Sequence, residues 1–259
     1  MIYIPSLKTA RFTADIHEMY LFDSVKLTRM PEHLEQEQTT FAIHSMLEKT
    51  STSFEDARMW TVQERMLAIT NYIAGTQEDG EANFLVDTLN YTDYLQADKQ
   101  YLRDYAELGE YDGDQWRAYH LLGYMAEEIE RLEGEIVNPN TKQVIDGRLH
   151  WIIGCIACQL VPNDQFLDPT DTNYSQELLK RMIVIASLPE SDFLVLYSFL
   201  QKAQAELMHL FEIAITDQGI VAVSKPVEKE GGLIEQQYAR FLPSSIVSEP
   251  TRNLSRKFD

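Results

Sequence analysis

The sequence predicts a mainly α-helical protein with a small N-terminal β element, an irregular helical core and an extended C-terminal arm. Three observations predict this fold class. Thr61-Val-Gln-Glu64 has the spacing of a helix capping box and precedes an apolar face. Apolar residues recur at intervals of three and four over 193–214, as they do on the buried face of a long helix. Residues 1–30 instead combine β-branched and aromatic residues with a turn-forming Pro5, which is typical of strands.

The N-terminal elements follow from local patterns. Charged residues interrupt an apolar face after Pro31, which predicts an amphipathic helix, and Gly75 with the turn at 77–80 ends the next one. The expected elements are strands at 1–4, 7–12 and 19–30, and helices at 32–49 and 61–74.

The remaining core is expected to be helical. Asp114 can cap a helix that carries Trp116 and Tyr119 and runs to about residue 133. Residues 150–161 form a buried helix or a buried strand, and Gly154 with its small neighbours favours close helix packing. Two further helices are expected over 175–187 and 189–214, the second of them preceded by the capping-box spacing Ser187-Leu-Pro-Glu190.

The domain organisation follows from composition. We expect one mainly helical domain over 1–223, then a linker and an extended arm over 224–259 that ends in basic residues. The chain has 41 acidic and 22 basic residues, a net charge of −19. The tyrosine-rich section 76–135 alone holds 16 acidic and 4 basic residues, which gives −12. Such a section is either a solvated face or a surface that docks a basic partner.

The charge also excludes classes of partner. A chain this acidic repels phosphate backbones and anionic lipid, so we expect it to bind neither nucleic acid nor membranes. The longest apolar runs, at 151–161 and 193–200, are shorter than the roughly 20 residues that a transmembrane helix needs. The start of the chain lacks the long apolar stretch of a signal peptide, which predicts a cytosolic origin.

The residues with reactive side chains do not form a recognisable catalytic site. Cys155-Ile-Ala-Cys158 has metal or redox spacing, but it lies among apolar residues and has no second ligand pair, so we interpret both cysteines as core residues. The six histidines are scattered, and the sequence contains no acyl-enzyme, P-loop or dinucleotide-binding signature. We therefore predict that the protein is not an enzyme and uses no metal or cofactor. An unrecognised hydrolase would need carboxylates that converge in an apolar pocket.

The first 75 residues suggest a family. The N-terminal strand pair, the helix at 32–49 and then Met59-Trp-Thr-Val-Gln-Glu-Arg-Met-Leu-Ala-Ile69 resemble the baseplate hub and tail-assembly proteins of tailed bacteriophages, including the T-even-type hub subunit family. In that family a hydrophobic residue precedes Thr-Val-x-Glu at the start of a helix. The acidic section 76–135 and the cysteine pair are not part of this pattern.

The resemblance implies a structural role in the virion tail, after assembly in the host cytoplasm. The expected partners are other tail proteins, namely hub, tube and tape-measure proteins, in a larger assembly. One alternative is a tail-assembly chaperone that binds the tape-measure protein and is absent from the mature virion. Another is an acidic host-directed adaptor, or a mimic of nucleic acid.

Any functional residues would then be interface residues. Tyrosines join an apolar ring to a polar hydroxyl, and basic or aromatic residues in an arm can anchor a neighbouring chain. The candidate interface residues are Tyr91, Tyr94, Tyr101 and Tyr105 in the acidic section, and Arg240, Phe241, Leu242, Arg252, Arg256, Lys257 and Phe258 in the arm.

Overall fold

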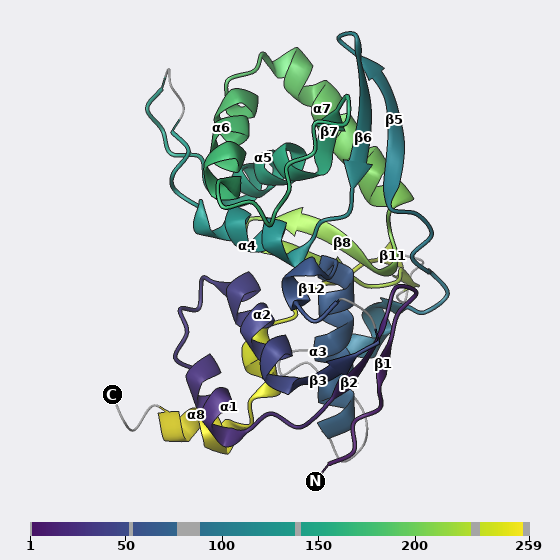
Figure 1. Ribbon diagram of the computed structural model, residues 1–259, viewed down its shortest axis with the longest axis vertical. Helices are drawn as coiled ribbons and strands as arrows, with labels where there is room; N and C mark the ends of the chain where they lie inside the picture. Colours follow the sequence, from purple (N-terminus) through teal and green to yellow (C-terminus); the bar gives the residue numbers. More distant parts are fainter. Residues whose placement is uncertain (1, 52–53, 77–88, 138–140, 229–233, 256–259) are drawn as a thin grey trace. The chain divides into compact units, whose positions relative to one another are not determined.

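The computed structural model describes residues 2–51, 54–76, 89–137, 141–228 and 234–255 (Figure 1). The chain forms two compact units. Unit 1 comprises residues 1–101, 209–212 and 221–259, and unit 2 comprises residues 102–208 and 213–220. The boundary expected at residue 223 does not coincide with this division, and the section 76–135 is divided between the two units. None of the described helices is long and apolar enough to cross a membrane.

The prediction of a mainly α fold is wrong, because helix accounts for 45% and strand for 21% of a mixed α/β structure with antiparallel sheets. The helical segments of unit 1 are α1 (Leu21–Leu27), α2 (Glu35–Met46), η1 (Ala57–Met59), α3 (Val62–Thr76), η2 (Tyr91–Tyr94), η3 (Pro243–Ile246) and α8 (Glu249–Ser255). Its strands are β1 (Leu7–Lys8), β2 (Thr13–Ile16), β3 (Leu47–Thr50), β4 (Leu95–Gln96), β10 (Val227–Glu228), β11 (Ile234–Glu235) and β12 (Tyr238–Ala239).

Unit 2 contains α4 (Gly123–Arg131), α5 (Gly147–Gln159), α6 (Tyr174–Ala186), α7 (Glu190–Glu206), β5 (Tyr105–Tyr111), β6 (Asp114–Tyr119) and β7 (Leu160–Pro162). Strands β8 (Leu210–Thr216) and β9 (Gly219–Val223) have their outer ends in unit 1 and the turn between them in unit 2. The sheets have the strand orders β1-β2-β3, β10-β11, β12-β9-β8-β4 and β5-β6-β7.

Strands replace parts of two expected helices. The helix predicted from Asp114 to about residue 133 is helical only in its second half, as α4, and its first half is strand β6 of the β5–β6 hairpin. The turn residues of this hairpin, Asp112 and Gly113, have φ values of 54° and 81°. A two-residue turn with both φ values positive matches the twist of a hairpin, and Asp-Gly is a preferred sequence for it. The helix predicted to reach residue 214 ends at Glu206, and the segment from Leu210, which is rich in aromatic and β-branched residues, forms β8. The strand predicted over 19–30 is also wrong, since this segment contains α1.

The predicted capping box at the start of α3 is confirmed. The Thr61 amide donates to Glu64 Oε2 at 2.9 Å, and the Glu64 amide donates to Thr61 Oγ1 at 3.2 Å. The Arg11 guanidinium binds the same carboxylate through two N–H groups, with Nε to Oε1 at 3.0 Å. Thr61 Oγ1 also lies 2.9 Å from His209 Nε2. A helix cap therefore ties the N-terminal strands and β8 to α3 inside unit 1.

Ser187 does not form the second capping box. Its hydroxyl donates to the Ile183 carbonyl at 2.8 Å and so bonds the end of α6, and α7 begins after Pro189 without a side-chain cap. A serine near a helix end can bond backwards to the preceding turn, and here that local bond is the one made.

The predicted extended arm is wrong for its described part. Strand β12 pairs with β9, placing Tyr238 opposite Val223 and Ala239 opposite Ala222. The Phe241 ring, on a residue only 4% exposed, lies 4.6 Å from the Tyr91 ring and 5.2 Å from the Phe211 ring. Helix α8 then packs against α1. The C-terminal segment thus completes the core of unit 1.

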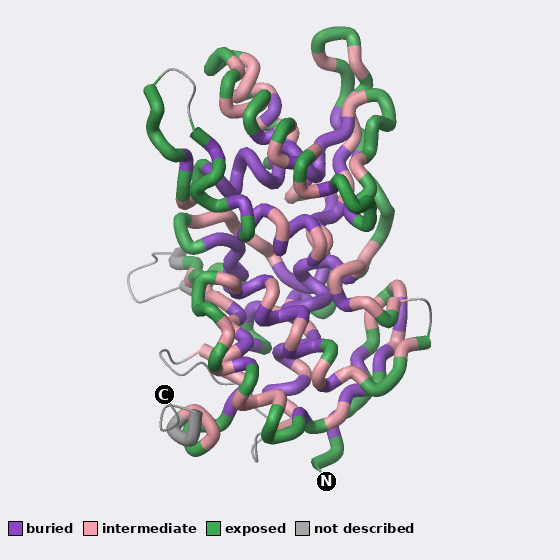
Figure 2. The backbone as a smooth tube through the Cα atoms, turned by 60° about the vertical axis from the view of Figure 1, so that its left-hand side comes forward, coloured by how far each residue is buried: buried purple, intermediate pink, exposed green. Residues whose placement is uncertain are grey.

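Helix α5 is at the centre of unit 2, and its residues from His150 to Gln159 are buried. Figure 2 colours buried segments such as this one purple. A Cβ atom on Gly154 would lie 2.7 Å from Ile129 of α4, so only glycine allows this approach, as the small residues predicted. Helices α6 and α7 pack against α5, and α7 also lies against the β5–β6 hairpin (Figure 1). Lys202 of α7 donates to the Glu107 carbonyl at 2.9 Å, and the Tyr111 hydroxyl donates to Asp192 Oδ1 at 2.8 Å.

Replacing Phe241 tests the role of the C-terminal segment. Phe241→Ala should lower the free energy of unfolding by about 3–5 kcal/mol, since it leaves a cavity beside Tyr91 and Phe211. Urea denaturation followed by circular dichroism measures the change. Tyr238→Ala is the control, because Tyr238 is 62% exposed on the neighbouring strand, and it should cost less than about 0.5 kcal/mol. Equal effects of the two substitutions would contradict this packing.

Candidate functional site

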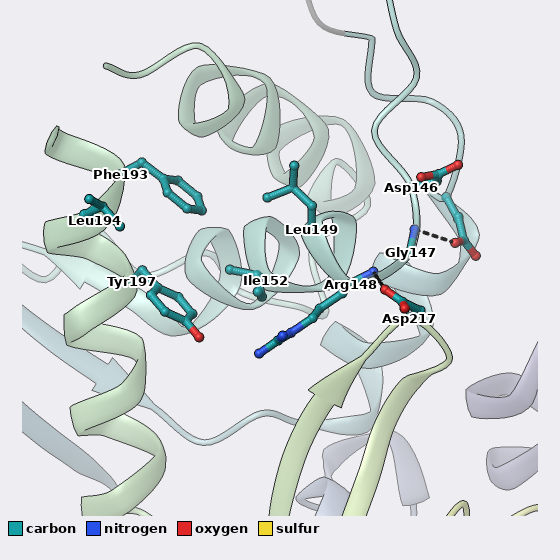
Figure 3. A pocket seen from close by; sticks show the side chains of 10 residues that line it. Asp146, Gly147, Arg148, Leu149, Ile152, Phe193, Leu194, Tyr197 and Asp217 are labelled. Carbon is teal, nitrogen blue, oxygen red and sulfur yellow. Dashed lines mark hydrogen bonds between the residues drawn. The ribbon is translucent and has the colours of Figure 1, made fainter. Parts of the chain in front are cut away.

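A hollow with both apolar and charged lining lies in unit 2, where it has a volume of about 820 Å³ (Figure 3). The start of α5 and the first two turns of α7 form its walls, and the turn between β8 and β9 contributes one carboxylate. We call this hollow the α5–α7 groove. Its lining residues are Glu133, Asp146, Gly147, Arg148, Leu149, Ile152, Phe193, Leu194, Tyr197 and Asp217.

One end of the groove is apolar. Leu149 and Ile152 project from α5 toward Phe193 and Tyr197 on α7, one helical turn apart on each helix (Figure 3). Leu149 remains 46% exposed and Leu194 53% exposed. A second hollow of about 430 Å³ shares Asp146, Leu149 and Phe193 with the groove, and extends it along the end of α6 to Ile185 and Leu188.

The other end is acidic, because carboxylates from distant segments cap α5. Glu133 Oε1 accepts from the Gly147 amide at 3.3 Å, and Asp217 Oδ1 accepts from the Arg148 amide at 3.2 Å. These are two of the four amides that a helix start leaves without a partner in the helix, and the helix dipole also favours negative charge there. Gly147 has a φ of 54°, a left-handed conformation that costs other residues more than glycine.

Two charged side chains of the groove have no such capping role. Asp146, the residue at the N-cap position, is exposed and makes no side-chain cap bond. Arg148 is also exposed, and its guanidinium extends into the hollow toward Tyr197 (Figure 3). The groove therefore offers apolar contact at one end, negative charge at the other and one guanidinium between them.

The cysteine pair lies elsewhere in unit 2, on the buried part of α5. Both thiols are free and 1% exposed, which confirms the interpretation of Cys155 and Cys158 as core residues. Burial raises the pKa of Cys155 to about 12, and it also raises the pKa of Cys158. A thiol with a raised pKa is a poor nucleophile and a poor metal ligand. Among the described residues, no group of three or more His, Cys, Asp or Glu side chains could hold a metal ion.

The four candidate tyrosines do not form one surface. Tyr91 and Tyr94 are 3% and 2% exposed in unit 1, where the Tyr91 hydroxyl donates to Ser245 Oγ at 3.0 Å. The Tyr101 ring lies edge-on to the His209 ring at 5.4 Å. Tyr105, in unit 2, is 38% exposed, and its ring lies 5.9 Å from the Tyr119 ring across the hairpin. Of the four, only Tyr105 has the exposure of a contact residue.

The C-terminal candidates also contact their own chain where they are described. Arg240 donates to Glu35 Oε2 from Nε at 3.0 Å, and Phe241 is in the core of unit 1. Leu242 is half-buried at the start of η3, and Arg252 is half-buried in α8. Arg256, Lys257 and Phe258 lie outside the described residues.

The groove residues are not among those expected from the sequence, although one signal points to them. The start of helix α7 has an apolar surface that is wider than a single helical face. Its apolar residues are at positions 193, 194, 196, 197, 199 and 200. Part of that apolar surface packs against α5 and part remains open in the groove, as the exposure of Leu194 shows.

The comparisons with known proteins identify no relative. No family model, curated protein or solved structure matches the chain.

Removing a distant cap should destabilise α5. Asp217→Ala should cost about 1 kcal/mol of unfolding free energy, because it leaves the Arg148 amide without its acceptor. Asp146→Ala is the matched control, and it should change stability by less than about 0.5 kcal/mol since Asp146 caps nothing. The measurement is urea denaturation, and a larger loss for Asp146→Ala would contradict this assignment of the caps.

The Arg240–Glu35 pair should produce a pH-dependent effect. Burial raises the pKa of Glu35 above its ordinary value, and the Arg240 charge and hydrogen bond oppose that rise. Arg240→Met should raise this pKa further, so the folded state would then hold an uncompensated buried carboxylate at neutral pH. Below the unfolded-state pKa, Glu35 is protonated in both states and the loss disappears. The destabilisation should therefore be largest at about pH 7 and shrink toward about pH 4 in urea denaturation. A pH-independent loss would mean that Arg240 acts by packing alone.

Proposed function

We propose that this chain is a binding protein that holds an apolar segment of a partner protein in the α5–α7 groove, with a basic residue of that segment at the acidic end. The observation that carries the proposal is the groove itself, an open hollow of about 820 Å³ in which Leu149 and Leu194 stay half-exposed on two facing helices. Exposed apolar surface that gathers in a concave site is typical of a site that a partner covers.

The energetics favour an apolar segment as the occupant. Fully burying a leucine side chain contributes about 1.5–3 kcal/mol, and the half-exposed Leu149 and Leu194 can still gain part of this. Two apolar residues of a partner, one helical turn apart, would match the spacing of Phe193 and Tyr197 on α7.

The charges favour a basic residue beside that apolar segment. Glu133, Asp146 and Asp217 carry three negative charges at one end of the groove, against the one positive charge of Arg148. The net charge of −19 also attracts a basic partner at long range and speeds its association. A partner segment with apolar residues at helical spacing and one Lys or Arg next to them would contact both the apolar end and the acidic end of the groove.

Peptide selection on the full chain tests this proposal. A library of random dodecapeptides should yield binders that carry apolar residues at helical spacing and at least one Lys or Arg. The double variant Leu149→Glu/Leu194→Glu should lose at least about 90% of the binding of a selected peptide, since two exposed apolar contacts become charged. Leu102→Glu is the control, because Leu102 is 80% exposed in the same unit but does not line the groove, and it should bind as the unmodified chain does. Selected peptides that bind the double variant equally well would refute the proposal.

A second copy of the chain is the competing occupant. Light scattering over a range of concentrations separates the two cases. A dimer of the unmodified chain that the double variant abolishes would assign the groove to self-association instead.

The role in a phage tail stays a prediction, and the groove does not depend on it. The motif that carries the resemblance has a structural role in unit 1, where Thr61 and Glu64 cap α3 and bind Arg11 and His209. Mass spectrometry of purified particles would test the prediction. A tail component stays in the particle with its hub and tube neighbours, a chaperone appears only with the tape-measure protein in lysate, and a host-directed adaptor appears with a host protein.

A further inference from the structure

Unit 2 has another hollow that differs from the groove in its chemistry. It has a volume of about 300 Å³ and is lined by residues of α5, α6, α7 and the β6–β7 strand pair. Trp116, Ile156, Leu160 and Leu196 provide apolar walls from four different elements, and its charged residues, Glu177, Lys180 and Arg181, all come from α6. We call this hollow the Arg181 pocket.

Arg181 is the unusual residue of the pocket. It is half-buried, and burial lowers the pKa of its guanidinium. Its Nη2 donates to the Gln165 carbonyl at 2.6 Å, which uses one of the five N–H donors of the side chain. No ion pair joins Arg181 to a carboxylate of the described residues, although the chain has 41 acidic residues to 22 basic ones.

The nearby carboxylate is already engaged. Glu177 accepts from Lys180 Nζ at 2.6 Å, one helical turn along α6. Burial is the main cause of the lowered pKa of Arg181, and the charge of Glu177 does not offset it. The pocket therefore contains two cations and one paired carboxylate, a net positive charge in a strongly acidic chain.

Burial removes water molecules that would accept hydrogen bonds from the guanidinium. A single hydrogen bond to a carbonyl does not replace them all. A carboxylate does so well, because it accepts two parallel N–H bonds from the planar fork of an arginine. The volume is at the small end of ligand-binding pockets, which suits a molecule of roughly ten non-hydrogen atoms.

We propose that the Arg181 pocket binds a small apolar monocarboxylate, with its carboxylate on the Arg181 guanidinium and its apolar part between Trp116, Ile156 and Leu196. This binding would be a second activity of unit 2, independent of a partner in the α5–α7 groove.

A matched pair of probes tests the charge requirement. Phenylacetate and phenylacetamide have nearly the same shape, but only phenylacetate is charged. Titration into the full chain, followed by heteronuclear NMR of the indole N–H groups, should give a saturable shift of the Trp116 signal with phenylacetate, at a roughly millimolar Kd. Trp60, in unit 1, and Trp151, outside the pocket lining, are internal controls whose signals should not move. No saturable Trp116 shift, or equal binding of the two probes, would overturn the proposal.

Variants at the mouth of the pocket test its location without disturbing the core. Val184 lines the pocket and is 62% exposed, so Val184→Asp and Val184→Asn should fold alike. The Asp variant should weaken phenylacetate binding by at least about fivefold relative to the Asn variant, since its charge repels the ligand. Arg181→Met should weaken binding by about tenfold or more, and Arg181→Lys should retain part of it. Equal affinities for Val184→Asp and Val184→Asn, or for Arg181→Met and the unmodified chain, would overturn the assignment. Leu149→Glu/Leu194→Glu should leave phenylacetate binding unchanged, so the two proposals can fail separately.

Discussion

The close approach of α5 to α4 is the constraint on which unit 2 depends. A side chain at Gly154 would meet Ile129 at 2.7 Å, so the glycine allows α5 to lie in the middle of the unit with every residue from 150 to 159 buried. A helix so enclosed can expose apolar residues only at its first turn. Leu149 is in that first turn. The carboxylates of Glu133 and Asp217 accept hydrogen bonds from the backbone amides of the same turn. The groove therefore combines apolar surface and negative charge because both belong to the one open end of a buried helix.

Unit 1 is organised by a different interaction, the buried Glu64 carboxylate. It accepts a hydrogen bond from the Thr61 amide, which completes the capping box of α3, and it binds the Arg11 guanidinium from the N-terminal strands. The Thr61 hydroxyl in turn lies within hydrogen-bond distance of His209. The Glu64 side chain is fully buried, so losing one partner would leave a charge or donor unsatisfied. The same residues carry the predicted resemblance to phage hub proteins, which no match to a known protein supports. Their structural use explains why they occur at this spacing whatever the protein binds.

The two hollows of unit 2 have opposite electrostatics. The α5–α7 groove has three carboxylates and one arginine, and the Arg181 pocket has two cations and one paired carboxylate. In a chain of net charge −19, the acidic groove agrees with the overall field and the cationic pocket opposes it locally. The two proposals therefore assign ligands of opposite charge to the two hollows, a basic segment to the groove and an anion to the pocket.

The features that can be predicted from the sequence are those that depend on neighbours within a few residues. These are the capping box at Thr61 and Glu64, the helix after it, the small residue that lets α5 pack closely, and the apolar setting of Cys155 and Cys158. The turn residues Asp112-Gly113 also favour a hairpin, but the spacing of the aromatic residues after them predicts a helical face. The remaining features depend on contacts between segments that are far apart in the chain. Phe241 is buried against Tyr91, about 150 residues away, and the groove is formed by α5, α7 and a carboxylate from the β8–β9 turn. The spacing of apolar residues shows that one face of a segment is apolar. It does not show which distant segment of the chain covers that face. Only the folded arrangement shows which apolar surface remains open.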